Sequence, residues 1–171
     1  AAEILLPSDI FKARVDEEAL RFSTLDRLAE EFAASLTATG SRFAFLNRAH
    51  CAFVLAEGGF VRYASRSSSL RDINAWIPNG YKVPPSSLAA QGKNLSSTQQ
   101  QVVDPTEWFE DWDRGGTLYE EARYLSQWDQ TLSLLWFEED RLPSGGTSEY
   151  EQDEDSDPYC SELSGDLPWP K

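Results

Sequence analysis

The spacing of the apolar residues changes at Cys51, and this change divides the chain into a helical part and a β-rich part. Before Cys51, apolar residues recur at the spacing of one helical face, at Leu25, Leu28, Ala29, Phe32 and Ala33. After it, residues 51–56 and 60–64 form two β-rich runs around Gly58 and Gly59, which supply the positive φ angles of a hairpin turn. The sequence therefore predicts an α+β chain.

The first two predicted helices follow Pro7. Ser8 or Asp9 can accept hydrogen bonds from the first N–H groups of a short helix that runs to about Val15. Ser23 precedes the apolar helical face, and Asp26 follows it by three residues, as in a capping box with Asp in place of the usual Glu. We therefore expect Ser23 to cap the second helix.

A third helix is predicted to start at Ser35 or Thr37 and to end before Asn47. Its side chains expected in the core are Phe43, Phe45 and Leu46. With the preceding helix it has a helix-turn-helix outline, and toward DNA it would offer Thr37, Thr39, Ser41, Arg42 and Arg48. Residues 1–79 carry ten acidic and nine basic side chains, whereas DNA readers normally carry several phosphate-neutralising Lys or Arg. We therefore favour packing of these helices in a core over DNA binding.

The remaining β-rich pattern predicts a second hairpin. Its strands are expected at residues 118–124 and 131–138, joined through residues 126–130. Between the hairpins we expect a helix over 70–76, a short helix or loop over 84–90 and a polar loop over 92–101. The predicted organisation is a helical segment, residues 1–48, followed by a small antiparallel-sheet domain, residues 49–141.

The charge of the chain is concentrated toward its C-terminus. The formal net charge is -14, and residues 142–171 carry eight acidic side chains and one basic side chain. This segment lacks the apolar periodicity needed to bury a face, so we predict a disordered acidic tail. The alternative is an interaction tail or a mimic of nucleic acid. The net charge opposes binding to DNA and to anionic lipid, and no apolar stretch approaches the roughly 20 residues of a spanning helix.

The two cysteines, Cys51 and Cys160, lie far apart and outside any CxxC motif. Free thiols and a cytoplasmic location are therefore expected. His50 is the only histidine, so the chain has no HExxH zinc motif, and no GxSxG motif is present either. We expect a half-exposed histidine and a small core cysteine, with no metal, cofactor or catalytic site in this chain.

Carboxylates and aromatic residues gather in the second half of the chain. The carboxylates are Glu107, Glu110, Asp111, Asp113, Glu120 and Glu121, and the pattern favours a solvated face over acid–base catalysis. Trp108, Phe109 and Trp112 have helical spacing and more often fill a core than a ligand pocket. A small domain of this kind nevertheless has room for a cavity that senses a small molecule, or for a peptide groove.

Two short motifs resemble the ImmA/IrrE family of zinc metallopeptidases. Residues 1–7, AAEILLP, resemble the FAAELLMP-like end of the family's active-site region, with Leu6 where Met is common. The pattern Leu25-x-x-Leu28-Ala29-x-x-Phe32-x-x-Ser35, followed by Arg42, is similar to the family's next helices. The similarity extends less specifically through residues 51–54, the Gly-Gly turn and residues 132–136, and so covers most of residues 1–141.

The resemblance implies a function for the parent protein. Members of the family are cytoplasmic endopeptidases that hold zinc through an HExxH helix and a further Glu, and they often cleave helix-turn-helix repressors. The chain has no Met at its start, and the resemblance implies that the zinc ligands precede Ala1; Glu3 is a remote candidate. The expected role is substrate recognition and sensing, catalytically incomplete as given. The alternatives are a stand-alone PAS- or GAF-like ligand-binding module and a helix-turn-helix regulator.

Overall fold

The computed structural model describes residues 8–15 and 18–138. The predicted acidic tail, residues 142–171, and the family-like residues 1–7 lie outside this part of the chain. Its secondary structure combines helices with one antiparallel sheet, so the α+β prediction is confirmed. No helix within the described ranges is long and apolar enough to cross a membrane.

Three helices open the described part: α2 (Ser8–Val15), α3 (Phe22–Glu31) and α4 (Leu36–Leu46). Helix α4 begins as predicted, because the Ser35 side chain accepts a hydrogen bond from the amide of Ala38, and Asn47 ends it. The predicted cap of α3 is wrong. Arg21 occupies the N-cap position without a side-chain hydrogen bond, and Ser23 lies inside the helix.

The sheet contains five antiparallel strands in the order β2-β1-β5-β4-β3. The strands are β1 (Cys51–Glu57), β2 (Phe60–Arg66), β3 (Gln99–Val103), β4 (Leu118–Leu125) and β5 (Gln130–Phe137). Both predicted hairpins are present. Gly58 and Gly59 have φ angles of 58° and 80°, as the predicted turn between β1 and β2 requires.

The segments between the hairpins differ from the prediction. The helix expected over residues 70–76 is the shorter α5 (Ser68–Asp72), and η1 (Leu88–Asn94) is a 3-10 helix that extends past residue 90. The polar loop expected over 92–101 includes the start of β3. Strand β3 pairs only with β4, so it is an edge strand. Its first three residues, which carry polar side chains, form part of the backbone pairing with β4. The short α6 (Pro105–Trp108) follows it.

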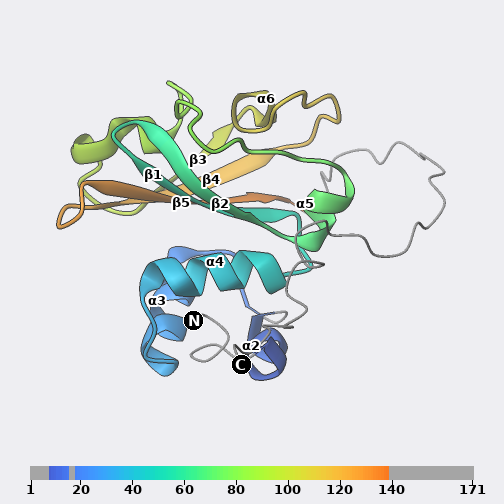
Figure 1. Ribbon diagram of the computed structural model, residues 1–171, viewed down its shortest axis with the longest axis vertical. Helices are drawn as coiled ribbons and strands as arrows, with labels where there is room; N and C mark the ends of the chain where they lie inside the picture. Colours follow the sequence, from blue (N-terminus) through green and yellow to red (C-terminus); the bar gives the residue numbers. More distant parts are fainter. Residues whose placement is uncertain (1–7, 16–17, 139–171) are drawn as a thin grey trace, which may run out of the picture.

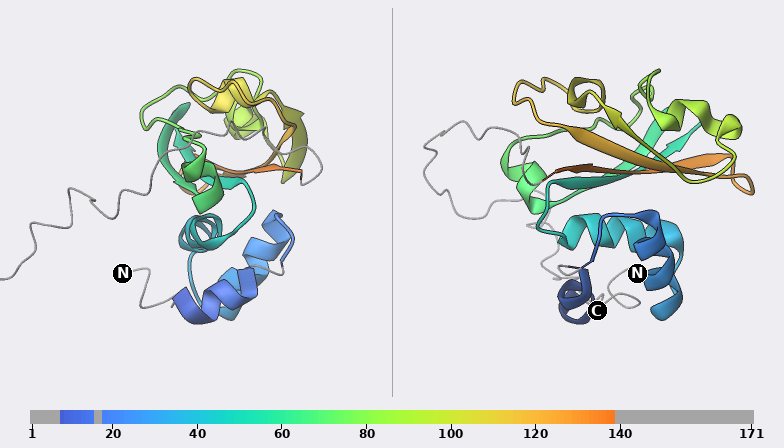
Figure 2. Two further views of the ribbon diagram at one scale, coloured as in Figure 1. Left: turned by 90° about the vertical axis from the view of Figure 1, so that its right-hand side faces the viewer. Right: turned by 180° about the vertical axis from the view of Figure 1, so that it is seen from behind.

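The helices and the connecting segments lie on opposite faces of the sheet (Figures 1 and 2). On the helix face, α2 to α4 share one core with β1 and β5, formed by Phe11, Phe22, Leu25, Leu28, Phe43, Phe53, Leu132 and Leu134, among others. On the connection face, a second core includes Val54, Leu70, Ile77, Trp108, Phe109, Leu118, Leu135 and Phe137. The division of the chain into two domains, residues 1–48 and 49–141, stays a prediction.

Helix α4 lies very close to the sheet. A Cβ atom added at Gly40 would stand 2.2 Å from Cε2 of Phe53, so only glycine permits this approach. The core prediction is confirmed for Phe43, which is fully buried. It is wrong for Phe45, which is 46% exposed and carries the guanidinium of Arg71 over its ring at 4.6 Å.

Candidate ligand cavity between η1 and the sheet

A buried carboxylate holds η1 against the sheet. Side chains alternate along β4, so Glu120 points to the connection face, where it is fully buried. Its carboxylate oxygens accept hydrogen bonds from the backbone amides of Leu88 at 2.8 Å and Ala89 at 3.1 Å. These amides are at the start of η1, where backbone N–H groups lack partners within the helix. Glu120 therefore anchors the beginning of η1.

Two side chains complete the surroundings of Glu120. Gln101 Nε2 and Ser133 Oγ donate to its oxygens at 3.0 Å and 3.1 Å. Burial raises the pKa of Glu120, and the four hydrogen bonds oppose that rise only in part. The expectation of a solvated carboxylate is thus wrong for Glu120. It fits Glu107, Glu110, Asp111 and Asp113, which are exposed, while Glu121 is half-buried.

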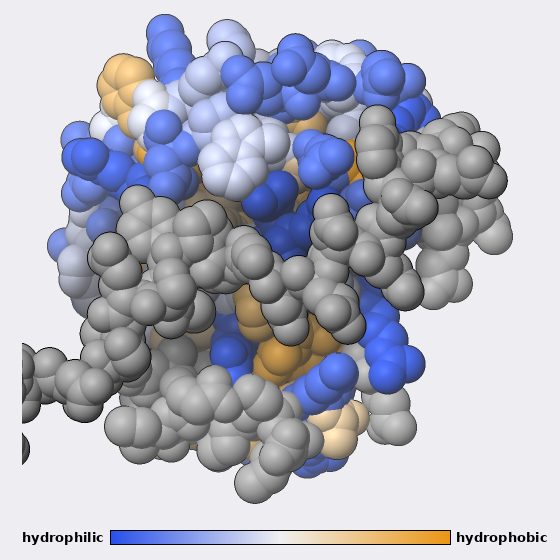
Figure 3. Space-filling model, turned by 45° about the vertical axis from the view of Figure 1, so that its right-hand side comes forward, coloured by the Kyte–Doolittle hydropathy of each residue, from blue (hydrophilic) through white to orange (hydrophobic). Residues whose placement is uncertain are grey.

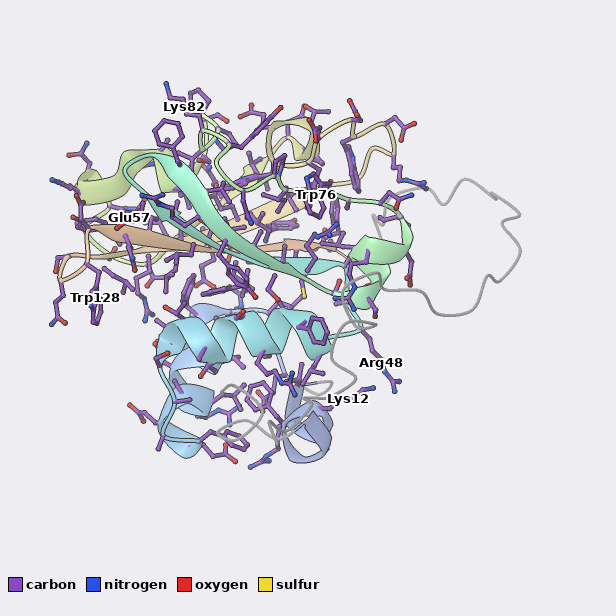
Figure 4. All side chains as sticks on the ribbon, viewed as in Figure 1. Lys12, Arg48, Glu57, Trp76, Lys82 and Trp128 are labelled. Atoms are coloured by element: carbon purple, nitrogen blue, oxygen red, sulfur yellow. The ribbon has the colours of Figure 1, made fainter. Side chains whose placement is uncertain are left out.

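A cavity of about 400 Å³ lies beside this anchor, between η1, the β1–β2 turn and the end of the β4–β5 hairpin. Its lining consists of Ala56, Gly58, Gly59, Ala89, Ala90, Gln91, Gly92, Lys93, Asn94, Tyr124, Asp129 and Thr131. Figure 4 shows Glu57, just before the first turn, and Trp128, in the second turn, at the same end of the sheet. The volume is within the range of small-molecule sites, about 300–1,000 Å³.

Charged and hydroxyl groups meet at the wall of this cavity. The hydroxyl of Tyr124 lies 2.8 Å from Oδ1 of Asp129, and this contact is the main cause of the raised pKa of Tyr124. Lys93 Nζ lies 3.7 Å from the other Asp129 oxygen, and both side chains are exposed. An exposed ion pair contributes only about 0–1 kcal/mol, so both charges are available to a polar ligand.

The backbone of η1 is kinked where it borders the cavity. Gly92 has φ 48° and ψ -118°, which lies outside helical geometry and divides η1. A side chain at this φ angle would be strained, although the space beside Gly92 is open. The glycine therefore brings bare backbone to the cavity wall beside Lys93.

The aromatic residues singled out by their spacing belong to a core, as predicted. Trp108 and Phe109 are 3% and 1% exposed. The ring of Trp112 stacks on that of Phe137 with centroids 5.1 Å apart and lies at the same separation from Phe109. These contacts fill the connection face at the end of the sheet remote from the η1 cavity.

The histidine and the described cysteine are in the predicted environments. Cys51 is fully buried, and burial raises the pKa of its thiol to about 12. His50 is half-buried. Burial lowers its pKa, and the nearby charge of Asp72 raises it by less. Among residues 8–15 and 18–138, no group of three or more His, Cys, Asp or Glu side chains is arranged to hold a metal ion.

Two of the five residues that a DNA-reading α4 would offer, Thr39 and Ser41, are buried or bonded to the sheet. Thr39 is fully buried, and the Ser41 hydroxyl lies 2.7 Å from the Tyr63 hydroxyl of β2. The carbonyl of Ser41 also accepts a hydrogen bond from Ser65 Oγ at 2.8 Å. This part of α4 therefore faces β2.

Sequence reasoning did not find the cavity, because its walls come from three separated segments. No family model matches the chain. A comparison with curated proteins finds no match either.

Proposed function

We propose that residues 49–138 form a PAS- or GAF-like sensor that binds a small polar molecule in the η1 cavity. The observation that carries this proposal is the cavity itself, about 400 Å³ with Lys93 and Asp129 at its wall. Opposite charges 3.7 Å apart match a zwitterionic or polar ligand better than an apolar one. The sheet with a long β2–β3 connection laid over one face is the architecture such a sensor needs (Figure 1).

A ligand in this cavity has a physical route to the helices. It would contact η1, whose start is anchored on Glu120 of β4, and β4 also carries Arg123 on the other face. The guanidinium of Arg123 makes two hydrogen bonds to Asp26 of α3, at 2.6 Å and 2.8 Å. Strand β4 thus contacts both the cavity anchor and the helical layer.

The sensor belongs, in this proposal, to a cytoplasmic ImmA/IrrE-like zinc endopeptidase that cleaves a transcriptional repressor. Support comes from the motifs at residues 1–7 and 25–35. The described residues hold no group of three or more His, Cys, Asp or Glu arranged for a metal ion. By the family resemblance the zinc ligands are proposed to precede Ala1, and no catalytic step is assigned to this chain. The test is the coding sequence upstream. Absence of an HExxH motif within about a hundred residues before Ala1 would remove the enzyme from the proposal.

The same cavity supports a stand-alone sensor without a protease. The upstream sequence separates the two, since only the peptidase requires a pair of histidines one helical turn apart. The helix-turn-helix regulator is less favoured, because Thr39 is buried, Ser41 contacts Tyr63 of β2, and the net charge of -14 repels DNA.

The sensor itself is tested by thermal unfolding with a screen of amino acids, nucleosides and organic acids. A ligand at a hundredfold excess over its Kd stabilises the fold by about 2.7 kcal/mol, which raises Tm measurably. The Lys93→Gln/Asp129→Asn double variant should lose the shift, and Lys82→Gln, outside the cavity lining, should keep it. An equal shift in all three proteins would place the ligand elsewhere.

A further inference from the structure

Two arginines lie over exposed aromatic rings at the end of the sheet remote from the η1 cavity. The guanidinium of Arg71 in α5 lies 4.6 Å from the ring centroid of Phe45. That of Arg66, at the end of β2, lies 4.5 Å from the ring of Trp76. Phe45 and Trp76 are 46% and 48% exposed. We call these four residues, together with Arg48, the arginine surface.

The guanidinium groups of Arg66 and Arg71 donate hydrogen bonds to backbone carbonyls. Arg71 donates a hydrogen bond to the carbonyl of Arg66 at 2.8 Å, and Arg66 donates to the carbonyl of Ala75. Within the described ranges, neither guanidinium pairs with a carboxylate. Burial and the nearby charge of Arg71 lower the pKa of Arg66. An anionic group on this surface would relieve that repulsion.

Arg48 brings a third guanidinium to the same end of the sheet. Ser69 of α5 donates to the carbonyl oxygens of Arg48 and Ala49, at 2.8 Å and 3.1 Å, and so ties the end of α4 to α5. Figure 4 shows the Arg48 side chain directed outward from the end of α4. On the face drawn in Figure 3, strongly hydrophilic residues border an apolar area. The guanidinium groups of Arg66 and Arg71 thus lie beside the exposed rings of Trp76 and Phe45.

The chain leaves the sheet at this same end. The amide of Phe137, the last residue of β5, donates to the carbonyl of His50 at 3.0 Å, two residues after Arg48. Residues 142–171, with eight acidic side chains and one basic, follow within a few positions. A short tether gives a segment an effective concentration on the order of millimolar at a nearby site. Opposite charge and proximity thus both favour binding of residues 142–171 to the arginine surface.

We propose that the acidic segment 142–171 binds in cis to the arginine surface. Its carboxylates pair with Arg48, Arg66 and Arg71, and its aromatic side chains contact the ring of Phe45. An external acidic partner would then have to displace the segment before it reaches the surface. A DNA backbone would also suit arginines, but the net charge of -14 disfavours its approach. The proposal does not depend on the sensor function.

The experiment uses the whole chain with a nitroxide spin label on Cys160. Cys51 is fully buried, so under native conditions the label enters only at Cys160, and mass spectrometry verifies one label per chain. Paramagnetic broadening of backbone amide signals then reports which residues the segment visits. We expect broadening centred on α5, the end of α4 and the end of β2, and its loss at high salt.

The Arg48→Gln/Arg71→Gln double variant should lose the localised broadening. The control is Arg62→Gln, since Arg62 lies on β2 but pairs with Glu57 at 2.9 Å. It should keep the wild-type pattern, and dispersed amide signals verify folding of each variant. Broadening that is uniform, centred elsewhere or unchanged in the double variant would overturn the proposal. So would the absence of broadening together with shifts of these amides by an added DNA duplex.

Discussion

Glu120 and Glu121 are neighbours on β4, yet their carboxylates accept backbone hydrogen bonds from the starts of two different helices, on opposite faces of the sheet. Glu120 accepts from Leu88 at the start of η1, and Glu121 accepts from the amide of Phe22 at the start of α3, at 2.7 Å. The strand alternation separates the two carboxylates. One strand therefore positions both the cavity helix and the helical layer.

Replacement of Glu120 tests its role as an anchor. Leu88 and Ala89 donate to different oxygens of Glu120, so in Glu120→Gln the new NH₂ group replaces the acceptor of one of these two buried amides. We expect a loss of about 1–3 kcal/mol in the free energy of unfolding, measured by urea denaturation. The exposed Asp113→Asn should change it by less than about 0.5 kcal/mol. Equal effects of both substitutions would contradict the assignment.

The pH dependence of stability should carry a signature of Glu120. Burial raises its pKa in the folded protein above the ordinary value of 4.5, so the folded state binds this proton more tightly than the unfolded chain does. Its contribution to stability is then fully present below pH 4.5 and is lost as pH rises through the raised pKa. Urea denaturation should show the advantage of wild type over Glu120→Gln shrinking with increasing pH. An advantage that grows with pH would contradict this.

The sequence predicted the elements that are determined by residues adjacent in the chain. The Gly58-Gly59 turn, the Ser35 cap and the apolar run of β5 depend on adjacent residues. The sequence did not predict strand β3, because its first three residues are glutamines and so show no alternation of apolar and polar side chains. Only pairing with β4, such as Gln101 opposite Glu120, makes them a strand.

The site was less predictable than the fold. The backbone donors to Glu120 belong to Leu88 and Ala89, more than thirty positions away, and no sequence pattern relates them to Glu120. Asp26 matched a capping box, but its carboxylate pairs with Arg123 across the helix–sheet interface. Phe45 has core-like spacing, yet it lies under Arg71 at the rim of the sheet. Tertiary contacts decided each of these positions.

The Arg123–Asp26 pair should stabilise the contact between α3 and the sheet. Its two hydrogen bonds are bidentate, and the side chains are 25% and 43% exposed. We expect a double-mutant cycle with Arg123→Gln and Asp26→Asn to give a coupling of about 1 kcal/mol that weakens with salt. The more exposed Arg14–Glu31 pair, at 2.8 Å, is the control and should couple less. A coupling near zero would show that the Arg123–Asp26 pair does not stabilise the contact between α3 and the sheet.

The close approach of α4 to the sheet makes Gly40 sensitive to substitution. Alanine is usually better than glycine inside a helix by about 1 kcal/mol. At this position its Cβ would overlap the ring of Phe53, so Gly40→Ala should lower the free energy of unfolding by about 1–3 kcal/mol. The double variant with Phe53→Leu should recover part of the loss in urea denaturation. A more stable Gly40→Ala would show that α4 sits farther from the sheet.

Cys51 should not react with a thiol reagent in the folded protein. Burial raises its pKa to about 12, so almost no thiolate forms near pH 8, and its sulfur is shielded beneath α4. With Ellman's reagent, native chain should release one equivalent of chromophore, from Cys160, and urea-unfolded chain two. The Cys160→Ser variant should release none until it unfolds. Rapid native reaction of that variant would mean that α4 opens away from β1.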